Sequence, residues 1–124
     1  HVGLGYPIIL PFIVQCLIAS EKIIIIEEPE IHLHPKLEAD LAELIIDSSI
    51  KRNNQFIIET HSENFLLGIL KNIRDGKISH KDVQVSYVHI DKDQSLVDEL
   101  TLNDKGSFES NWRHGFFTER LDLI

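Results

Sequence analysis

The sequence predicts an α/β fold in which a mostly parallel sheet is flanked by helices and followed by a C-terminal β-hairpin. Two observations indicate this class. Helix-length apolar segments alternate with short β-branched runs, which is the order of βαβ units. In addition, residues 23–26 are four consecutive isoleucines, a run that suits a strand buried on both faces of a parallel sheet.

The first half of the chain is predicted to hold a helix, a strand and a second helix. The first helix covers residues 7–19, an apolar run with prolines near its first turn. The strand covers residues 23–28 and stops at Pro29, which cannot donate to a sheet ladder. The second helix begins at Pro35 and runs to about residue 51, because leucine and isoleucine recur at helical spacing.

The second half is predicted to hold a strand, a helix and a hairpin. The strand covers residues 55–59, and Ser62 is expected to cap a helix that ends near Gly76. Strands over 83–90 and 95–102 then form an antiparallel hairpin, which we expect at the edge of the parallel sheet.

The pattern of helices and strands divides the chain into two regions. Residues 1–105 are predicted to be one α/β domain, and residues 106–124 an aromatic extension. In that extension Trp112, Phe116 and Phe117 would be costly to leave in water, so they are expected to dock on the body or on a part outside this chain. The sequence holds no methionine, and we expect it to be a piece of a longer protein.

Composition excludes several classes of function. The formal net charge is −8, which argues against this segment binding a phosphate backbone by itself. The apolar run 8–18 is too short to span a bilayer, so no membrane partner is expected. The one cysteine, Cys16, lies in an apolar stretch that predicts a buried thiol. Without an intrachain disulfide, the sequence fits a cytoplasmic setting.

Acidic residues and a histidine follow the two central strands. Glu27 and Glu28 end the first strand, and Glu59 and His61 end the second. Because the carboxyl ends of parallel strands meet at one edge of a sheet, these side chains are expected to lie close together. Such a set suits a nucleoside triphosphate with Mg²⁺: one carboxylate holds the ion through water, another polarises an attacking water, and the histidine reaches the γ-phosphate.

The same residues resemble a known family. Two motifs carry the resemblance: Glu-Glu-Pro-Glu-Ile-His-Leu-His-Pro at 27–35 and Glu-Thr-His-Ser-Glu at 59–63. Together they are similar to motifs of the ABC-like AAA ATPases grouped with the overcoming-lysogenisation-defect, RecF and SMC proteins. The resemblance implies part of a P-loop NTPase fold, the C-terminal half of an ABC-like head. It also implies ATP hydrolysis within a larger protein, in DNA metabolism or phage defence.

The resemblance further implies a role for each residue. Glu27, at the end of a Walker B strand, would be the acid on the Mg²⁺ side, and Glu28 the catalytic base. His61 would be the switch histidine, and His34 would lie on the D-loop. Residues 2–5, with Gly3 and Gly5, resemble a signature loop that reaches ATP bound to a second head. A homodimer of heads is therefore expected, with any DNA bound by regions outside this chain.

Two features depart from the family pattern. Tyr6 and Pro7 follow the glycines where the family usually has a serine, and no G-x-x-x-x-G-K-[ST] phosphate loop is present. Without that loop the chain lacks a phosphate cradle. We therefore expect the 124 residues alone neither to bind nor to hydrolyse ATP appreciably.

Two alternatives remain open at this stage. The chain can be a non-catalytic interaction or dimerisation module that retains the fold. It can also be a metal-dependent hydrolase, with a transition-metal site built from His32, His34 and His61. Glu30 and Glu63 are expected only to favour the helix N-terminus that follows each of them.

Overall fold

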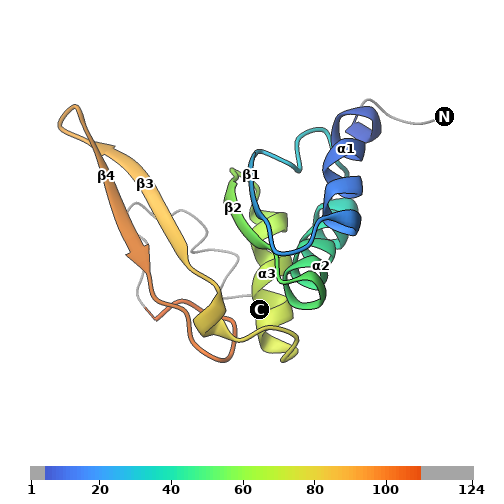
Figure 1. Ribbon diagram of the computed structural model, residues 1–124. Helices are drawn as coiled ribbons and strands as arrows, with labels where there is room; N and C mark the ends of the chain where they lie inside the picture. Colours follow the sequence, from blue (N-terminus) through green and yellow to red (C-terminus); the bar gives the residue numbers. More distant parts are fainter. Residues whose placement is uncertain (1–4, 110–124) are drawn as a thin grey trace. The chain divides into compact units, whose positions relative to one another are not determined.

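The structure is a computed structural model that describes residues 5–109, with side chains described from Ile9 onward. The chain divides into two compact units, residues 1–72 and 73–124 (Figure 1). The helices and strands, in order, are α1 (Gly5–Ile18), β1 (Ile23–Glu27), α2 (Pro35–Arg52), β2 (Gln55–Glu59), α3 (Glu63–Arg74), the 3₁₀ turn η1 (His80–Asp82), β3 (Val85–Asp91) and β4 (Gln94–Leu100).

The first unit is built on a parallel pair of strands. β1 and β2 pair in register from Ile23 opposite Gln55 to Glu27 opposite Glu59. Helix α2 connects them, so the segment is the βαβ unit that the sequence predicts. Both strands run in the same direction, so their carboxyl ends lie at one edge of the sheet.

One hydrophobic core holds the sheet against the helices. Figure 1 shows α1 and α2 on the same side of the β1–β2 pair, and α3 contributes Phe65 and Ile69 to the same core. The sheet contributes its alternate residues: Ile24 and Ile26 from β1, with Phe56 and Ile58 from β2. The helices contribute a further set of buried residues: Ile9, Phe12, Cys16, Leu41, Ala42 and Ile45.

The expectation that the four-isoleucine strand is buried on both faces is wrong for the structure. Ile23 and Ile25 are 65% and 71% exposed, and Ile57 beside them on β2 is 53% exposed. All three helices contribute their apolar side chains to the opposite face of the sheet. Alternate residues of a strand point to opposite faces, so a sheet covered by one layer buries only every second isoleucine.

Helix α1 is likewise only half covered. Ile9, Phe12 and Cys16 form its buried stripe at helical spacing. Its outer side exposes Leu10, Val14, Leu17 and Ile18. The helix begins at Gly5, so the glycine loop expected over Gly3 and Gly5 does not extend as far as Gly5. Gly3 lies outside the described residues.

Helices α2 and α3 approach closely where both carry small residues. A Cβ atom added to Gly68 would lie 2.8 Å from the Cβ of Ala42 and 3.3 Å from the Cα of Ala39. Real Cβ atoms do not come that close to another carbon, so only glycine fits here without moving a helix. This contact sets α3 against α2 just after the site-bearing segment that follows β2.

A buried asparagine ties the amino ends of the sheet to the helices. The Asn54 side chain accepts from the Lys22 amide (3.0 Å) and donates to the Ala19 carbonyl (2.8 Å) and to Ser48 Oγ (3.1 Å). Ser48 in turn donates to the Cys16 carbonyl at 2.7 Å. These bonds satisfy carbonyls at the end of α1 that have no helical partner.

Cys16 is buried, as its apolar neighbours in the sequence predict. Burial raises the pKa of its thiol from 9.0 to about 11. The thiolate is the reactive form of cysteine, so little nucleophile is present at neutral pH. Cys16 is therefore a core residue of α1.

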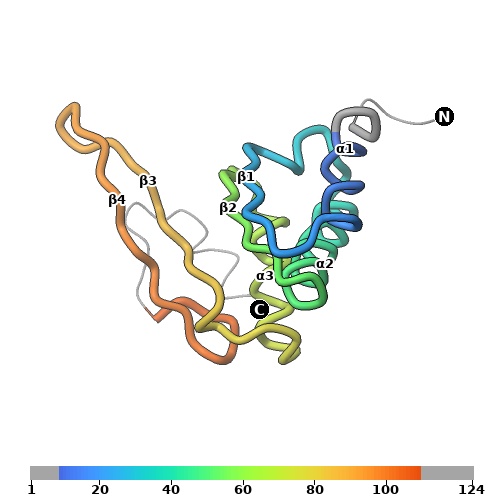
Figure 2. The backbone as a smooth tube through the Cα atoms, in the orientation of Figure 1, coloured from blue at the N-terminus to red at the C-terminus, as the bar shows by residue number. Residues whose placement is uncertain are grey.

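The second unit contains the antiparallel hairpin. β3 and β4 pair from Val85 opposite Leu100 to Asp91 opposite Gln94, and Figure 2 shows them running side by side to a tight turn. Contrary to expectation, the hairpin is not paired to the edge of the parallel sheet, because β3 and β4 form a two-stranded sheet of their own. The alternating polar residues of β3 distinguish it from the wholly apolar β1 run.

A part-buried contact between two polar side chains supports the hairpin. His89 on β3 and Asp98 on β4 are joined at 3.0 Å between Nε2 and Oδ2, and the His89 ring stacks on Tyr87 with centroids 5.4 Å apart. The aromatic extension predicted for residues 106–124 is described only up to Glu109. Its three large aromatic residues, Trp112, Phe116 and Phe117, lie outside the described residues.

Replacing Asn54 by Ala is expected to lower the free energy of unfolding by about 2–3 kcal/mol, because it leaves the part-buried Lys22 amide and the buried Ala19 carbonyl without partners. Urea denaturation measures the change. Asn53→Gly is the matched control: Asn53 has φ +54°, which glycine tolerates, so its stability should stay within about 0.5 kcal/mol. Equal losses in the two variants would contradict this role for Asn54.

Candidate functional site

The two strand ends predicted to carry the chemistry lie side by side. Glu27 and Glu59 are paired in the ladder, and the Glu28 amide donates to the Glu59 carbonyl at 2.7 Å. The parallel pairing therefore continues one residue past β1. It places the carboxylates that follow the isoleucine run next to the segment that carries His61.

Glu28 has an uncommon backbone conformation. Its φ is +44°, in the left-handed region that side chains with a Cβ rarely occupy. The Glu28 carbonyl accepts from the Ile31 amide at 3.1 Å, which closes a tight turn directly after the strand. Backbone strain of this kind is concentrated at functional sites, where the surrounding structure holds it.

His61 connects the two strand ends. Its Nε2 lies 3.3 Å from Oε1 of Glu28 and 3.7 Å from Oε1 of Glu59. The imidazole is 74% exposed, and both carboxylates are also open to solvent. The group is thus accessible to a ligand, and it joins the two motifs that the sequence predicts to act together.

Glu27, by contrast, extends the exposed face of the sheet. It follows Ile25 by two residues and stands beside Glu59 in the ladder. An exposed carboxylate at a strand end is the kind of oxygen ligand that Mg²⁺ binds through water. The role predicted for Glu27 on the Mg²⁺ side stays a prediction, and His61 contacts Glu28 and Glu59 instead.

His34 has a structural function that the sequence did not predict. It is the N-cap of α2, where its Nδ1 accepts from the Lys36 amide at 3.3 Å and Pro35 occupies the first helical position. His32 is exposed and has φ +64°. The predicted contact of His34 with nucleotide stays a prediction.

Sequence reasoning missed the part played by Glu30. It was expected only to favour the N-terminus of the next helix, but the residue is 6% exposed and its carboxylate accepts a hydrogen bond from Thr60 Oγ1. Within residues 9–109, its second oxygen, Oε2, is buried without a hydrogen-bond partner. The signal in the sequence was the threonine beside the histidine, but no spacing rule connects it to Glu30.

The alternative metal site is not assembled. Among the residues that the structure describes, no group of three or more His, Cys, Asp and Glu side chains is arranged to hold a metal ion. His34 is engaged in capping α2, and His61 lies against Glu28. In the same part of the chain, no helix combines the length and the apolar character needed to cross a bilayer.

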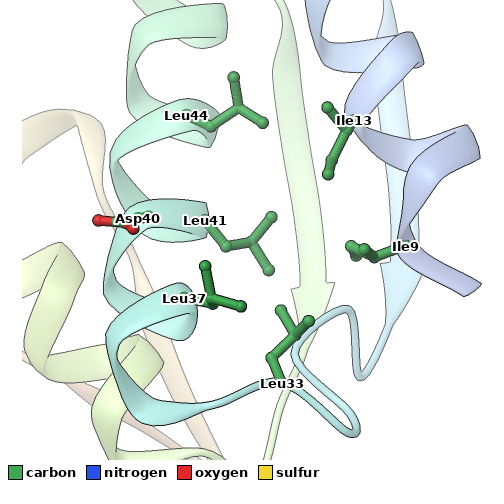
Figure 3. A pocket seen from close by; sticks show the side chains of 7 residues that line it. All are labelled: Ile9, Ile13, Leu33, Leu37, Asp40, Leu41 and Leu44. Atoms are coloured by element: carbon green, nitrogen blue, oxygen red, sulfur yellow. The ribbon is translucent and has the colours of Figure 1, made fainter. Parts of the chain in front are cut away.

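An apolar groove is lined by residues of α1, α2 and the turn before α2. It has a volume of about 130 Å³ and is lined by Ile9, Ile13, Leu33, Leu37, Asp40, Leu41 and Leu44. Figure 3 shows the leucines and isoleucines of α1, α2 and the intervening turn pointing toward one another, while the Asp40 carboxylate points away. The groove contains none of the acids or histidines discussed above, so we assign it no catalytic part.

A known protein family matches the first half of the chain. Residues 1–66 match the model of the AAA ATPase domain. This range includes both acidic strand ends and His61. The match covers more than half of the 124 residues. The chain belongs to the AAA ATPase domain family.

A curated relative extends the likeness beyond the ATPase match. The OLD nuclease of Thermus scotoductus is 32% identical over 116 residues, covering 85% of this chain and 21% of the relative. The chain thus spans about a fifth of the length of that relative. The search of solved structures found no match.

Because Glu28 has a left-handed conformation, we expect glycine to be more stabilising than alanine at this position, the reverse of the usual order. Glu28→Gly should unfold with a free energy about 1 kcal/mol higher than Glu28→Ala, because glycine adopts positive φ without the Cβ clash. Both variants lose the contact with His61, so that loss cancels. At Glu27, the last residue of β1, the order should reverse, so Glu27→Ala should have a higher free energy of unfolding than Glu27→Gly. Thermal and urea unfolding of the four variants measures both pairs. The same order at both positions would rule out strain at Glu28.

Proposed function

We propose that this chain supplies the hydrolytic edge of an ATPase head in a larger protein. The contact between His61 Nε2 and Glu28 Oε1, at 3.3 Å, is the observation that carries the proposal. It joins two motifs more than 30 residues apart in the sequence at the carboxyl edge of a parallel sheet, where α/β proteins bind ligands. Membership of the AAA ATPase domain family supports nucleotide as the ligand.

In this proposal each residue has one role. The oxygen of a water molecule attacks the γ-phosphorus in line, and Glu28 accepts a proton from that water. The bond between the γ-phosphorus and the bridging oxygen breaks. His61 donates a hydrogen bond to the γ-phosphate. Glu27 would hold Mg²⁺ through water, and the ion would supply positive charge to the phosphates. Glu59 lies on the other side of His61 and orients the imidazole.

The remaining parts of the proposed site come from elsewhere. No phosphate-loop motif is present in the 124 residues, so the cradle for the β- and γ-phosphates is supplied by another part of the protein. Gly3, Gly5 and His34 are proposed to face nucleotide held by a second, identical head. Residues 1–105 form the ATPase part in this proposal, and 106–124 a separate extension.

The process that consumes ATP is proposed from the relative. The name of the Thermus scotoductus protein states a nuclease, so we propose that hydrolysis here serves a reaction on nucleic acid. With a net charge of −8, this segment is a poor surface for a phosphate backbone. Nucleic acid is therefore proposed to bind outside these residues.

The substitution Glu28→Gln tests the assignment in the full-length protein. It removes the proton acceptor while keeping size and hydrogen bonding, so kcat for ATP hydrolysis should fall about 10²–10⁴-fold while ATP still binds. Steady-state phosphate release and equilibrium ATP binding measure the two effects. Glu21→Gln is the matched control, since Glu21 is an exposed acid that also has positive φ. Hydrolysis by Glu28→Gln within twofold of wild type would exclude Glu28 as the base.

A second candidate function is a non-catalytic dimerisation module. The uncovered sheet face favours it, because Ile23, Ile25 and Ile57 form an exposed apolar surface on paired strands. Such a surface is stabilised when another layer covers it. In this alternative a second copy of the chain provides that layer, and no nucleotide is hydrolysed.

Sedimentation of the chain tests the module. If a second copy covers the sheet face, the chain should sediment as a dimer and Ile25→Lys as a monomer, because a lysine on that face would have to be desolvated. Ile50→Lys is the matched control: Ile50 is 53% exposed but lies on α2. A wild-type chain that is monomeric at high micromolar concentration would contradict dimerisation through this face.

A further inference from the structure

His61 is not held in place by its own surroundings. Its side chain is 74% exposed, and its two contacts are with carboxylates that are themselves open to solvent. Exposed pairs of this kind fix geometry weakly. A group proposed to sense the γ-phosphate needs a defined position, so the constraint on His61 must come from its neighbours in the chain.

The residues on both sides of His61 are tied down by hydrogen bonds. Thr60 Oγ1 donates to the carboxylate of Glu30, and it accepts from the Ser62 amide at 3.0 Å. Ser62 Oγ donates to Oε2 of Glu38 and accepts from the Phe65 amide, both at 3.0 Å. The residues immediately before and after His61 are therefore both held by side-chain hydrogen bonds.

Both acceptors lie on the segment that follows β1. Glu30 lies two residues beyond Glu28, and Glu38 lies in the first turn of α2. The segment that carries the proposed base thus also holds the segment that carries the histidine. Movement of one strand end relative to the other would break one of these two bonds.

The burial of Glu30 indicates more than local packing. A carboxylate that is 6% exposed, with one oxygen lacking a partner among the described residues, costs free energy that an apolar side chain would avoid. What the carboxylate provides is a strong acceptor for the Thr60 hydroxyl. The carboxylate of Glu30 therefore serves to fix the position of Thr60.

We infer that Glu30 and Glu38 are positioning residues: through Thr60 and Ser62 they hold His61 against Glu28. The catalytic consequence rests on the proposed function, since it assumes that His61 acts on the γ-phosphate. The geometric part does not depend on it. Loss of either carboxylate–hydroxyl bond frees the backbone on one side of His61 and leaves the proposed base in place.

Kinetics of the full-length protein test the catalytic part. Thr60→Val keeps the shape of the side chain and removes its hydroxyl, so kcat for ATP hydrolysis should fall about 10–100-fold with KM within threefold. Thr60→Ser retains the hydroxyl and should recover most of the rate. Thr101→Val makes the same chemical change at an exposed threonine in the second unit and should have no effect. Glu38→Ala should reproduce the loss in kcat from the other side of His61.

Hydrogen exchange of this chain tests the geometric part without any activity. Thr60→Val should speed exchange of the Ser62 amide at least tenfold, because that amide donates to the lost hydroxyl. Exchange at Ile45 and Ile46, inside α2, should stay unchanged, which shows that the fold is intact. Unchanged exchange at Ser62, or a kcat for Thr60→Val within twofold of wild type, overturns the inference. Faster exchange with no effect of Glu28→Gln or His61→Ala on hydrolysis would instead reject the proposed function and leave the geometry standing.

Discussion

The parallel pairing of β1 and β2 is the constraint on which the rest of the first unit depends. Its register places Glu27 opposite Glu59, and the Glu28 amide extends it by one bond to the Glu59 carbonyl. A shift of either strand by one residue would reverse the faces of that strand and expose its core side chains. The same register that buries Ile24 therefore also determines which acids meet His61.

The pairing is supported at its two ends by different chemistry. At the amino end Asn54 joins the sheet to α1 and α2 through buried and part-buried hydrogen bonds, so the polar groups there are paired within the protein. At the carboxyl end the polar groups are open to solvent, apart from the buried pair of Glu30 and Thr60. A sheet with paired polar groups at its amino end and exposed polar groups at its carboxyl end is suited to hold a ligand at the carboxyl edge.

Backbone conformation and side-chain hydrogen bonds both contribute to the geometry of the site. Glu28 is kept in a left-handed conformation by the ladder bond before it and the turn after it. On both sides of His61 the chain is bonded to the segment after β1, through Thr60 and Ser62, and we infer that these bonds keep His61 near Glu28. Exposed reactive groups on a fixed backbone remain accessible to a ligand and need little reorganisation when it binds. Family membership supports nucleotide as the ligand, and this arrangement brings together the groups that are proposed to act on it.

The sequence by itself determined the elements and the residues of the proposed site. The isoleucine run, Ser62 as a cap and the turn before β4 are local signals, and the structure contains the strand, the capped helix and the hairpin they predict. Only the tertiary structure decided that one sheet face stays uncovered, that the hairpin forms its own sheet, and that Glu30 is buried against Thr60. Periodicity records which side chains share a face of an element. What covers that face, and which distant partner a polar group finds, depends on segments that meet only when the chain folds.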